Sequence, residues 1–230
     1  MGKLIVIDGL DGCGKQTQVA LVKQELEKLG YRVRQIEFPK YDSLSSGPVR
    51  MYLGGEISKE LNELNPYMCS LFYAVDRGLQ FIKDFKADYD DENCVIIADR
   101  YLSANIIYQS SKFNTDADKE EFFKWLYEIE TKYIGIPTED ITIALTLPIE
   151  VSQRLMSQRY SGDEGKKDLH EANLEFLAEC SKTLDLACNY LPTIGYNWVK
   201  VDCSTEDGWV KSREEITNIL MKLIKPILDC

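Results

Sequence analysis

Apolar residues recur along the chain with two different periods, and the periods alternate. Runs typical of strands occupy residues 4–7, 32–38, 94–98, 141–147 and 197–203. Between these runs, apolar residues recur every three or four positions, as on the buried face of a helix. Five strands alternating with helices predict an α/β fold built on a five-stranded, doubly wound parallel sheet.

A long helical pattern opens at Pro66, which suits the first helical position, with Asn65 as its cap, and extends to about residue 89. Two faces of this helix can be distinguished from the spacing. We expect the apolar face to lie against the core and a second face to carry side chains for chemistry. The first face holds Leu71, Ala74, Val75 and Leu79, and the second holds Tyr73, Asp76 and Arg77.

The first strand leads directly into a glycine-rich loop that contains the candidate chemistry. Gly9, Gly14 and Lys15 have the spacing G-x-x-x-x-G-K of a phosphate-binding loop, and a helical pattern follows. In such a loop, backbone N–H groups surround a phosphate, the lysine reaches the terminal phosphates, and the helix N-terminus faces the same anion. We therefore expect nucleotide phosphates to be bound by Gly9, Leu10, Asp11, Gly12, Cys13, Gly14, Lys15, Gln16 and Thr17.

One loop position departs from the pattern. The residue after the lysine is ordinarily Ser or Thr, whose hydroxyl binds Mg²⁺, but here it is Gln16, with Thr17 next. An amide oxygen is a poorer metal ligand, so the metal would depend more on carboxylates and water. The substitution also leaves open a protein that binds nucleotide with little turnover.

Composition and net charge limit the binding partners and the cellular compartment that we expect for this chain. The chain has 230 residues, 44% of them hydrophobic, and no run of 18 apolar residues or signal peptide is recognisable, so we expect a single cytoplasmic domain. A net charge of −11 argues against nucleic-acid or membrane partners. The seven cysteines are scattered and odd in number, which favours reduced thiols over disulfides or a zinc site.

Further polar residues are expected near the loop. Asp99 and Arg100 directly follow a buried strand, and ligands of open α/β sheets bind beyond the carboxyl ends of strands. A polar, glycine-containing segment at residues 160–167 lies between Arg159 and a later helix. We interpret residues 154–168 as a hinged lid, although a solvated loop between two helices has the same pattern.

Five segments together resemble the thymidylate kinase family, in the family's order and over nearly the whole chain. They are residues 8–18, 38–41, 72–77, 99–105 with Tyr108 and Gln109, and 168–171. The resemblance implies a P-loop kinase fold, transfer of the γ-phosphoryl group of ATP to dTMP with Mg²⁺, and a homodimer formed through helices. No guanine-reading Asn-Lys-x-Asp segment is present, which disfavours a GTPase. Other nucleoside or nucleoside monophosphate kinases remain alternatives.

The resemblance also implies roles for individual residues. Lys15 would serve the donor phosphates, and Arg100 the dTMP phosphate, which the family also contacts at the positions of Lys40 and Tyr41. A solvated loop charge is an equally good interpretation of Lys40. Some family members carry an arginine in the loop where this chain has Gly12. Because that cation is missing here, the resemblance implies that the catalytic cation comes from the lid: Arg159 first, then Arg154, Lys166 and Lys167. Asp11 would lie near the ribose and Mg²⁺, and Asp99 and Glu171 would be indirect Mg²⁺ partners.

For the base, the resemblance implies that Tyr73 stacks on thymine, Arg77 donates to O4 and Asn105 reads N3. Ala104 replaces a common serine, and His170 replaces a frequent tyrosine near the sugar. The remaining substrate contacts implied in this way are Phe38, Leu53 and Tyr108.

Overall fold

The computed structural model describes residues 1–60, 63–159 and 173–229, with the backbone alone for residues 157–159. Five parallel strands form one sheet in the order β2-β3-β1-β4-β5 among these residues. The strands are β1 (Lys3–Gly9), β2 (Arg32–Glu37), β3 (Cys94–Asp99), β4 (Ile141–Thr146) and β5 (Trp198–Asp202). The five-stranded doubly wound sheet predicted from the apolar pattern is confirmed.

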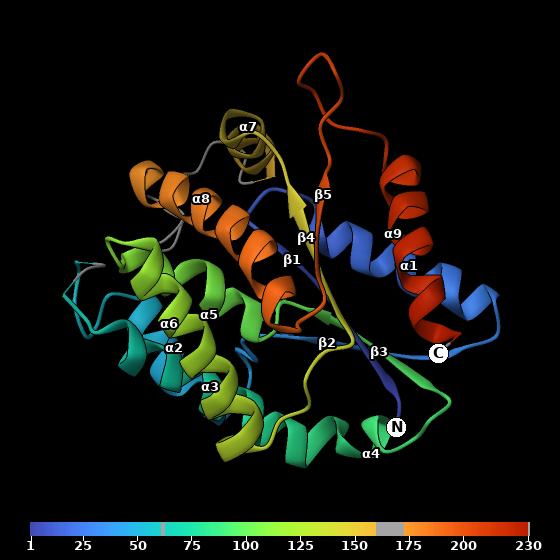
Figure 1. Ribbon diagram of the computed structural model, residues 1–230, viewed down its shortest axis with the longest axis horizontal. Coiled ribbons are helices and arrows are strands. Elements are labelled where there is room, and N and C mark those ends of the chain that lie inside the picture. The colour runs from blue at the N-terminus through green and yellow to red at the C-terminus, as the bar shows by residue number, and fades with distance from the viewer. Residues whose placement is uncertain (61–62, 160–172, 230) are drawn as a thin grey trace.

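Helices cover both faces of the sheet, as Figure 1 shows. On one face, α1 (Lys15–Lys28) and α9 (Arg213–Leu228) pack over β1 and β4. The other face is covered by α3 (Pro66–Gln80), α5 (Leu102–Tyr108), α6 (Asp116–Tyr127) and α8 (Leu174–Tyr190). Because both faces are covered, the inner strands are apolar at nearly every position: Leu4, Ile5, Val6 and Ile7 of β1 are all fully buried.

Shorter elements complete the chain. They are η1 (Leu44–Ser46), α2 (Gly47–Leu53), η2 (Phe81–Phe85), α4 (Lys86–Tyr89), η3 (Ser110–Lys112), η4 (Glu128–Ile134), α7 (Ile149–Arg159) and η6 (Leu191–Ile194). Two of them, η2 and η4, are π-helical segments that continue α3 and α6 without a break. No helix in the described parts of the chain is long and apolar enough to cross a membrane.

The helix that opens at Pro66 begins as predicted, because the Asn65 side chain accepts a hydrogen bond from the Tyr67 N–H (2.8 Å). The prediction of its core-facing residues was wrong for three of the four. Leu71, Val75 and Leu79 are 39%, 49% and 50% exposed, whereas Ala74 is buried. The polar face packs inward instead, since it meets the end of the sheet where the loops converge.

Candidate active site

The glycine-rich loop joins β1 to α1 and has a backbone that only glycine adopts without strain. Gly9, Gly12 and Gly14 have φ of +143°, +83° and +90°. A Cβ at Gly9 would also lie 2.2 Å from the Leu145 carbonyl oxygen of the neighbouring strand β4. The first turn of α1 follows at once, so its free N–H groups face the space above the loop.

Lys15 is the loop's buried cation, only 8% exposed. Its ammonium donates to the carbonyl oxygens of Gly9 (2.9 Å) and Leu10 (3.0 Å) and lies 3.5 Å from an Asp11 carboxylate oxygen. Burial favours the neutral amine, but the acidic groups around it outweigh burial and raise the pKa of Lys15. The side chain therefore carries a full positive charge beside the phosphate-binding backbone.

Asp11 connects the loop to the end of β3. One of its oxygens accepts a hydrogen bond from Arg100, and the other accepts from the Tyr108 hydroxyl (2.9 Å). Burial opposes ionisation, yet Arg100 and Lys15 hold the pKa of Asp11 well below its usual range. A carboxylate would repel the anion that this loop binds, but the charge of Asp11 is neutralised by these two cations.

Arg100 directly follows β3 and has a φ of +64°, an uncommon value for a residue with a side chain. Its N–H donates to the Ile7 carbonyl (3.3 Å), and its guanidinium lies 5.3 Å from the centre of the Tyr108 ring. Burial lowers its pKa, but Asp11 and its other acidic neighbours more than reverse this effect. Asp99 precedes it, half-buried, and burial raises the pKa of that carboxyl.

A cavity, which we call the acceptor cavity, lies beside the Asp11–Arg100 ion pair. Most of the residues expected to bind the acceptor line it. Arg77 and Asn105, both 1% exposed, lie on its wall. The expected lining residues found around it are Asp11, Phe38, Tyr41, Leu53, Tyr73, Arg77, Arg100, Ala104, Asn105 and Tyr108. Asn105 Nδ2 donates to the Ser70 carbonyl (3.2 Å), which leaves the amide oxygen as the free end of the side chain.

The loop lines a larger cavity of about 840 Å³. This cavity extends from Gly12 through Thr17 and Asp99 to Leu155 and Met156 of α7 and to residues 210–216. The two cavities share five residues: Asp11, Phe38, Pro39, Tyr41 and Arg100. A ligand in one therefore reaches a ligand in the other beside Asp11 and Arg100.

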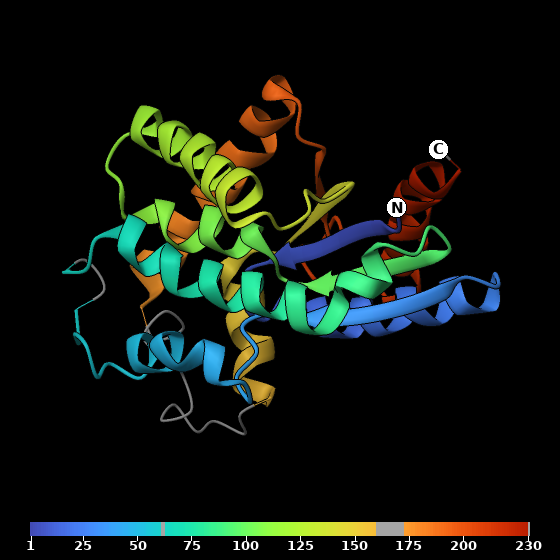
Figure 2. The same cartoon turned by 90° about the horizontal axis from the view of Figure 1, so that it is seen from below.

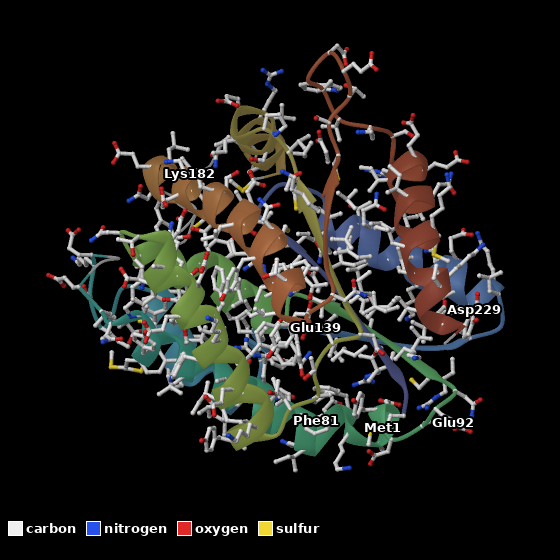
Figure 3. All side chains as sticks on the ribbon, in the orientation of Figure 1. Met1, Phe81, Glu92, Glu139, Lys182 and Asp229 are labelled. Atoms are coloured by element: carbon white, nitrogen blue, oxygen red, sulfur yellow. The ribbon has the colours of Figure 1, made fainter. Side chains whose placement is uncertain are left out.

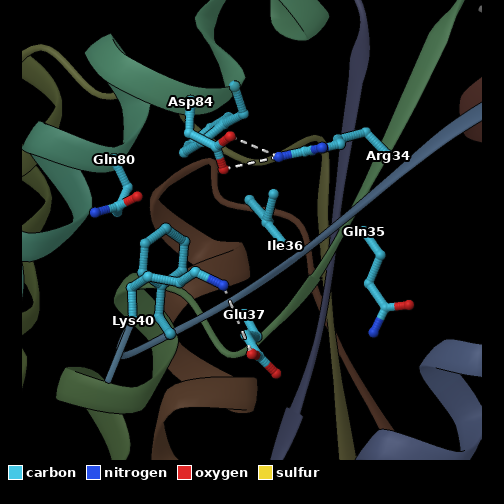
Figure 4. Close-up of a pocket in the computed structure, with 9 residues that line it drawn as sticks. Arg34, Gln35, Ile36, Glu37, Lys40, Gln80 and Asp84 are labelled. Carbon is cyan, nitrogen blue, oxygen red and sulfur yellow. Dashed lines mark hydrogen bonds and ion pairs between the residues drawn. The ribbon is translucent and has the colours of Figure 1, made fainter. Parts of the chain in front are cut away.

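Lys40, which was expected to contact the acceptor phosphate, lines neither of these two cavities. Its ammonium lies 3.9 Å from Glu37 and 3.7 Å from Asp42, beside a separate pocket next to β2 that Arg34, Gln35 and Asp84 also line, as Figure 4 shows. Its backbone N–H donates to the Asp76 carboxylate (2.8 Å).

Several expected residues fall outside what the structure describes. Lys166, Lys167, His170 and Glu171 belong to the segment 160–172, and Arg159 is placed by its backbone alone as the last residue of α7. Arg154 is described: its guanidinium carbon lies 5.0 Å from the centre of the Trp209 ring.

Two site residues were not anticipated from the sequence. Gln109 lines the acceptor cavity at 1% exposed, and its Oε1 has no hydrogen-bond partner among the described residues. Its position beside Tyr108 in a segment already associated with the site was a usable signal. Glu130 binds Arg77 from a helix 53 residues away, and no local pattern points to it.

Comparison with known proteins agrees with this geometry. A family model described as thymidylate kinase matches residues 7–192. A probable thymidylate kinase of Methanosphaera stadtmanae is 29% identical over 223 residues, covering 96% of this chain and 98% of that protein. The thymidylate kinase of Mycobacterium tuberculosis is 27% identical over 176 residues, covering 75% of this chain and 79% of that protein.

Among solved structures, the thymidylate kinase from Candida albicans superposes with a TM-score of 0.69 at 23% sequence identity, covering 98% of this chain and 92% of that one. At this identity the likeness concerns the fold.

Proposed function

Because the chain belongs to the thymidylate kinase family, we propose that it transfers the γ-phosphoryl group of ATP to the 5′-phosphate of dTMP, giving dTDP and ADP. One observation carries the proposal: the phosphate-loop cavity and the buried acceptor cavity meet at the Asp11–Arg100 ion pair. Phosphoryl transfer needs its two phosphates together at such a junction.

The residues at the junction suit a reaction between two anions. The acceptor oxygen of dTMP is already ionised, so no general base is needed, and the main obstacle is the repulsion between the two phosphates. Lys15 and the loop N–H groups bind the donor phosphates. Arg100 binds the acceptor phosphate through its planar fork, and Asp11 holds that fork from the side.

Mg²⁺ is the proposed cofactor. It prefers oxygen ligands, keeps several waters and is usually bound by one or two carboxylates together with substrate phosphates. Asp11 and Asp99 line the loop cavity beside Gln16 and Thr17, so this donor set fits such an ion. In the described residues no three His, Cys, Asp or Glu side chains gather as a metal cage. When bound, the ion neutralises charge on the donor phosphates.

The polar groups at the end of the acceptor cavity where Arg77 and Asn105 lie favour thymine over cytosine as the base. Thymine offers an acceptor at O4 and a donor at N3, and cytosine offers the reverse at both positions. Arg77 can only donate, and the free amide oxygen of Asn105 accepts. Tyr73 would stack on the ring, and Gln109 Oε1 is a second buried acceptor in the same cavity.

We further propose that residues 154–168 act as a lid within a single kinase domain. Its described part, the end of α7, packs on the phosphate loop: a Cβ at Gly12 would lie 2.9 Å from Met156 Cγ. A cationic lid over the donor phosphates would supply the charge that Gly12 does not. A cytoplasmic location stays a prediction from the sequence.

A homodimer is the proposed assembly. Five apolar side chains on one face of α3 and η2, which we call the α3 stripe, are 39–70% exposed and follow one another at intervals of three or four residues: Met68, Leu71, Val75, Leu79 and Ile82. In Figure 2, α3 crosses the near side of the molecule. A stripe of this kind can pair with the same stripe of a second copy about a two-fold axis, which suits a second copy of this chain.

A coupled assay of ADP release with ATP and dTMP, dUMP, dCMP or AMP tests the function. We expect kcat/KM to be highest for dTMP, lower for dUMP by a modest factor, since a methyl group contributes only about 1 kcal/mol or somewhat more, and at trace level for dCMP, whose hydrogen bonds are mismatched. Comparable activity on dCMP or AMP would show a general nucleotide kinase. Absence of turnover with every acceptor would show a nucleotide-binding protein.

A further inference from the structure

A buried ion pair joins α3 to η4 at the base end of the acceptor cavity. Arg77 Nε donates to Glu130 Oε2 (2.6 Å), and Arg77 Nη2 donates to the other oxygen of the same carboxylate. The two side chains are 1% and 0% exposed. Arg77 nevertheless lines the cavity, so one edge of its guanidinium meets Glu130 while the rest borders the ligand space.

Stability alone does not account for this pair. Removing two charges from water is costly, and apolar side chains of similar volume commonly stabilise a core as well or better. Tyr101, whose carbonyl accepts from Arg77, is itself fully buried in an apolar core cluster. A charged pair retained there therefore points to a use for the guanidinium in the cavity.

The partners of Arg77 determine how it can face a ligand. A guanidinium has five N–H donors in one plane. Glu130 of η4 takes two of them, and the carbonyl of Tyr101, the residue before α5, takes a third (3.2 Å). The bidentate contact holds the plane in one orientation, so the remaining two N–H groups have fixed directions.

The backbone around Glu130 supports this placement. Glu130 lies in the π-helical segment η4, which continues α6 and packs against α3. Its carbonyl accepts from both the Gly135 N–H (2.9 Å) and the Ile136 N–H (3.1 Å), which closes the segment. Short π-helical segments within α-helices often occur at functional sites, because they redirect a side chain.

We propose that Glu130 is a positioning residue for base selectivity: it holds the Arg77 guanidinium so that fixed N–H donors face position 4 of the acceptor's base. This inference rests on the proposed function, in which Arg77 donates to thymine O4. Glu130 itself does not touch the substrate. Its effect is to keep the arginine from turning to accommodate a base that offers an amino group there.

The variant Glu130→Asp tests the proposal in the full-length enzyme. It keeps the buried charge but withdraws the carboxylate by one methylene, so the two-point contact with Arg77 is lost. We expect the ratio of kcat/KM for dTMP to that for dCMP to fall by about tenfold or more, mainly through a higher KM for dTMP. The KM for ATP should stay within about twofold of wild type.

The chain offers a matched control in Glu139→Asp. Glu139 is also a buried carboxylate, 7% exposed, and accepts a hydrogen bond from the Tyr127 hydroxyl. It precedes β4, at the edge of the sheet where the strands begin, and is labelled in Figure 3. Glu139→Asp should lower the melting temperature without changing the dTMP to dCMP ratio.

A measurement on the wild-type enzyme covers the case in which Glu130→Asp does not fold. The ¹⁵N NMR signal of the Arg77 Nε–H, assigned by its disappearance in Arg77→Lys, should be protected from solvent exchange both without and with dTMP. Loss of that protection on binding dTMP would mean that Arg77 leaves Glu130 to meet the base, which overturns the proposal.

Two further outcomes distinguish the role of Glu130 from the proposed preference for thymine. A wild-type enzyme that prefers dTMP, with a folded Glu130→Asp variant that keeps the same preference, overturns the role of Glu130 alone. A wild-type enzyme without any preference for dTMP over dCMP overturns the proposed base reading and this inference with it.

Discussion

At the scale of single residues, the site is governed by how each buried charge is compensated. Asp11 is held ionised by Arg100 and Lys15, which lower its pKa. Asp8, three residues earlier, is fully buried and accepts hydrogen bonds from the Gly9 N–H (2.7 Å) and the Ser103 hydroxyl (2.6 Å). The same influences, burial against Arg100 and Lys15, therefore shift the pKa values of these two carboxyls in opposite directions.

Asp8 gives a pH prediction. Burial raises its pKa above the ordinary value of 3.8, despite Arg100, Lys15 and its hydrogen bonds. A raised pKa in the folded state means that this group's favourable contribution is present below 3.8 and is lost as the pH rises through the folded-state pKa. The variant Asp8→Asn should therefore gain melting temperature relative to wild type as the pH rises from 4 to 7.

Thermal melts of both proteins across this range provide the measurement. The control is Glu92→Gln, an exposed carboxylate labelled in Figure 3, whose difference from wild type should not vary with pH in the same direction. A constant difference between Asp8→Asn and wild type would contradict the assignment of burial as the dominant effect.

At the scale of elements, the phosphate loop and α7 form one packed unit. Gly12 has a φ of +83°, and the space where a side chain would begin is occupied by the Ser152 carbonyl and by Met156. The arginine that some family members carry at this position would therefore displace α7.

The variant Gly12→Ala measures that packing. Strain at positive φ and the contact with the α7 backbone should together lower the free energy of unfolding by about 1–3 kcal/mol, and a displaced α7 should lower kcat. Gly30→Ala is the control, since Gly30 has a φ of +92° but no atom within 4 Å of the added Cβ. Urea unfolding should show a smaller loss there, and equal losses would contradict a specific α7 contact.

At the scale of the whole molecule, the sheet brings distant segments to one edge. The loop after β1, the end of β3 and the loop after β5 all lie beyond the carboxyl ends of parallel strands, where α/β proteins bind ligands. The inward face of α3 carries Tyr73 and Arg77 to the same edge. The outward face carries the α3 stripe, so the proposed base contacts and the proposed dimer contact share one helix.

The dimer prediction follows from that stripe. Val75→Lys, at its centre, should convert a dimer into single chains of 26.4 kDa, because a charge buried in an apolar interface has no partner. Light scattering coupled to size exclusion measures the mass. Leu29→Lys, a substitution at an equally exposed leucine after α1, should leave the dimer intact. A wild-type enzyme that is already monomeric would exclude the assembly.

The sequence by itself determined the features that depend on neighbours along the chain. The alternation of five apolar runs with helical segments, the cap at Asn65 and the loop that follows the first strand depend on local periodicity and backbone geometry, and each appears as predicted. The same holds for Arg100, whose place beside the loop follows from the rule that parallel strands end together.

Only the tertiary structure decided which face of a helix is turned inward and which distant residues meet. The period of Leu71, Val75 and Leu79 shows that they share a face, but not whether this chain or a second copy covers that face. Glu130 contacts Arg77, 53 residues away in the sequence, because η4 packs against α3, and no spacing in the sequence predicts that packing. Burial and pairing between separate elements depend on how the elements are oriented in three dimensions, and a local pattern carries no information about that orientation.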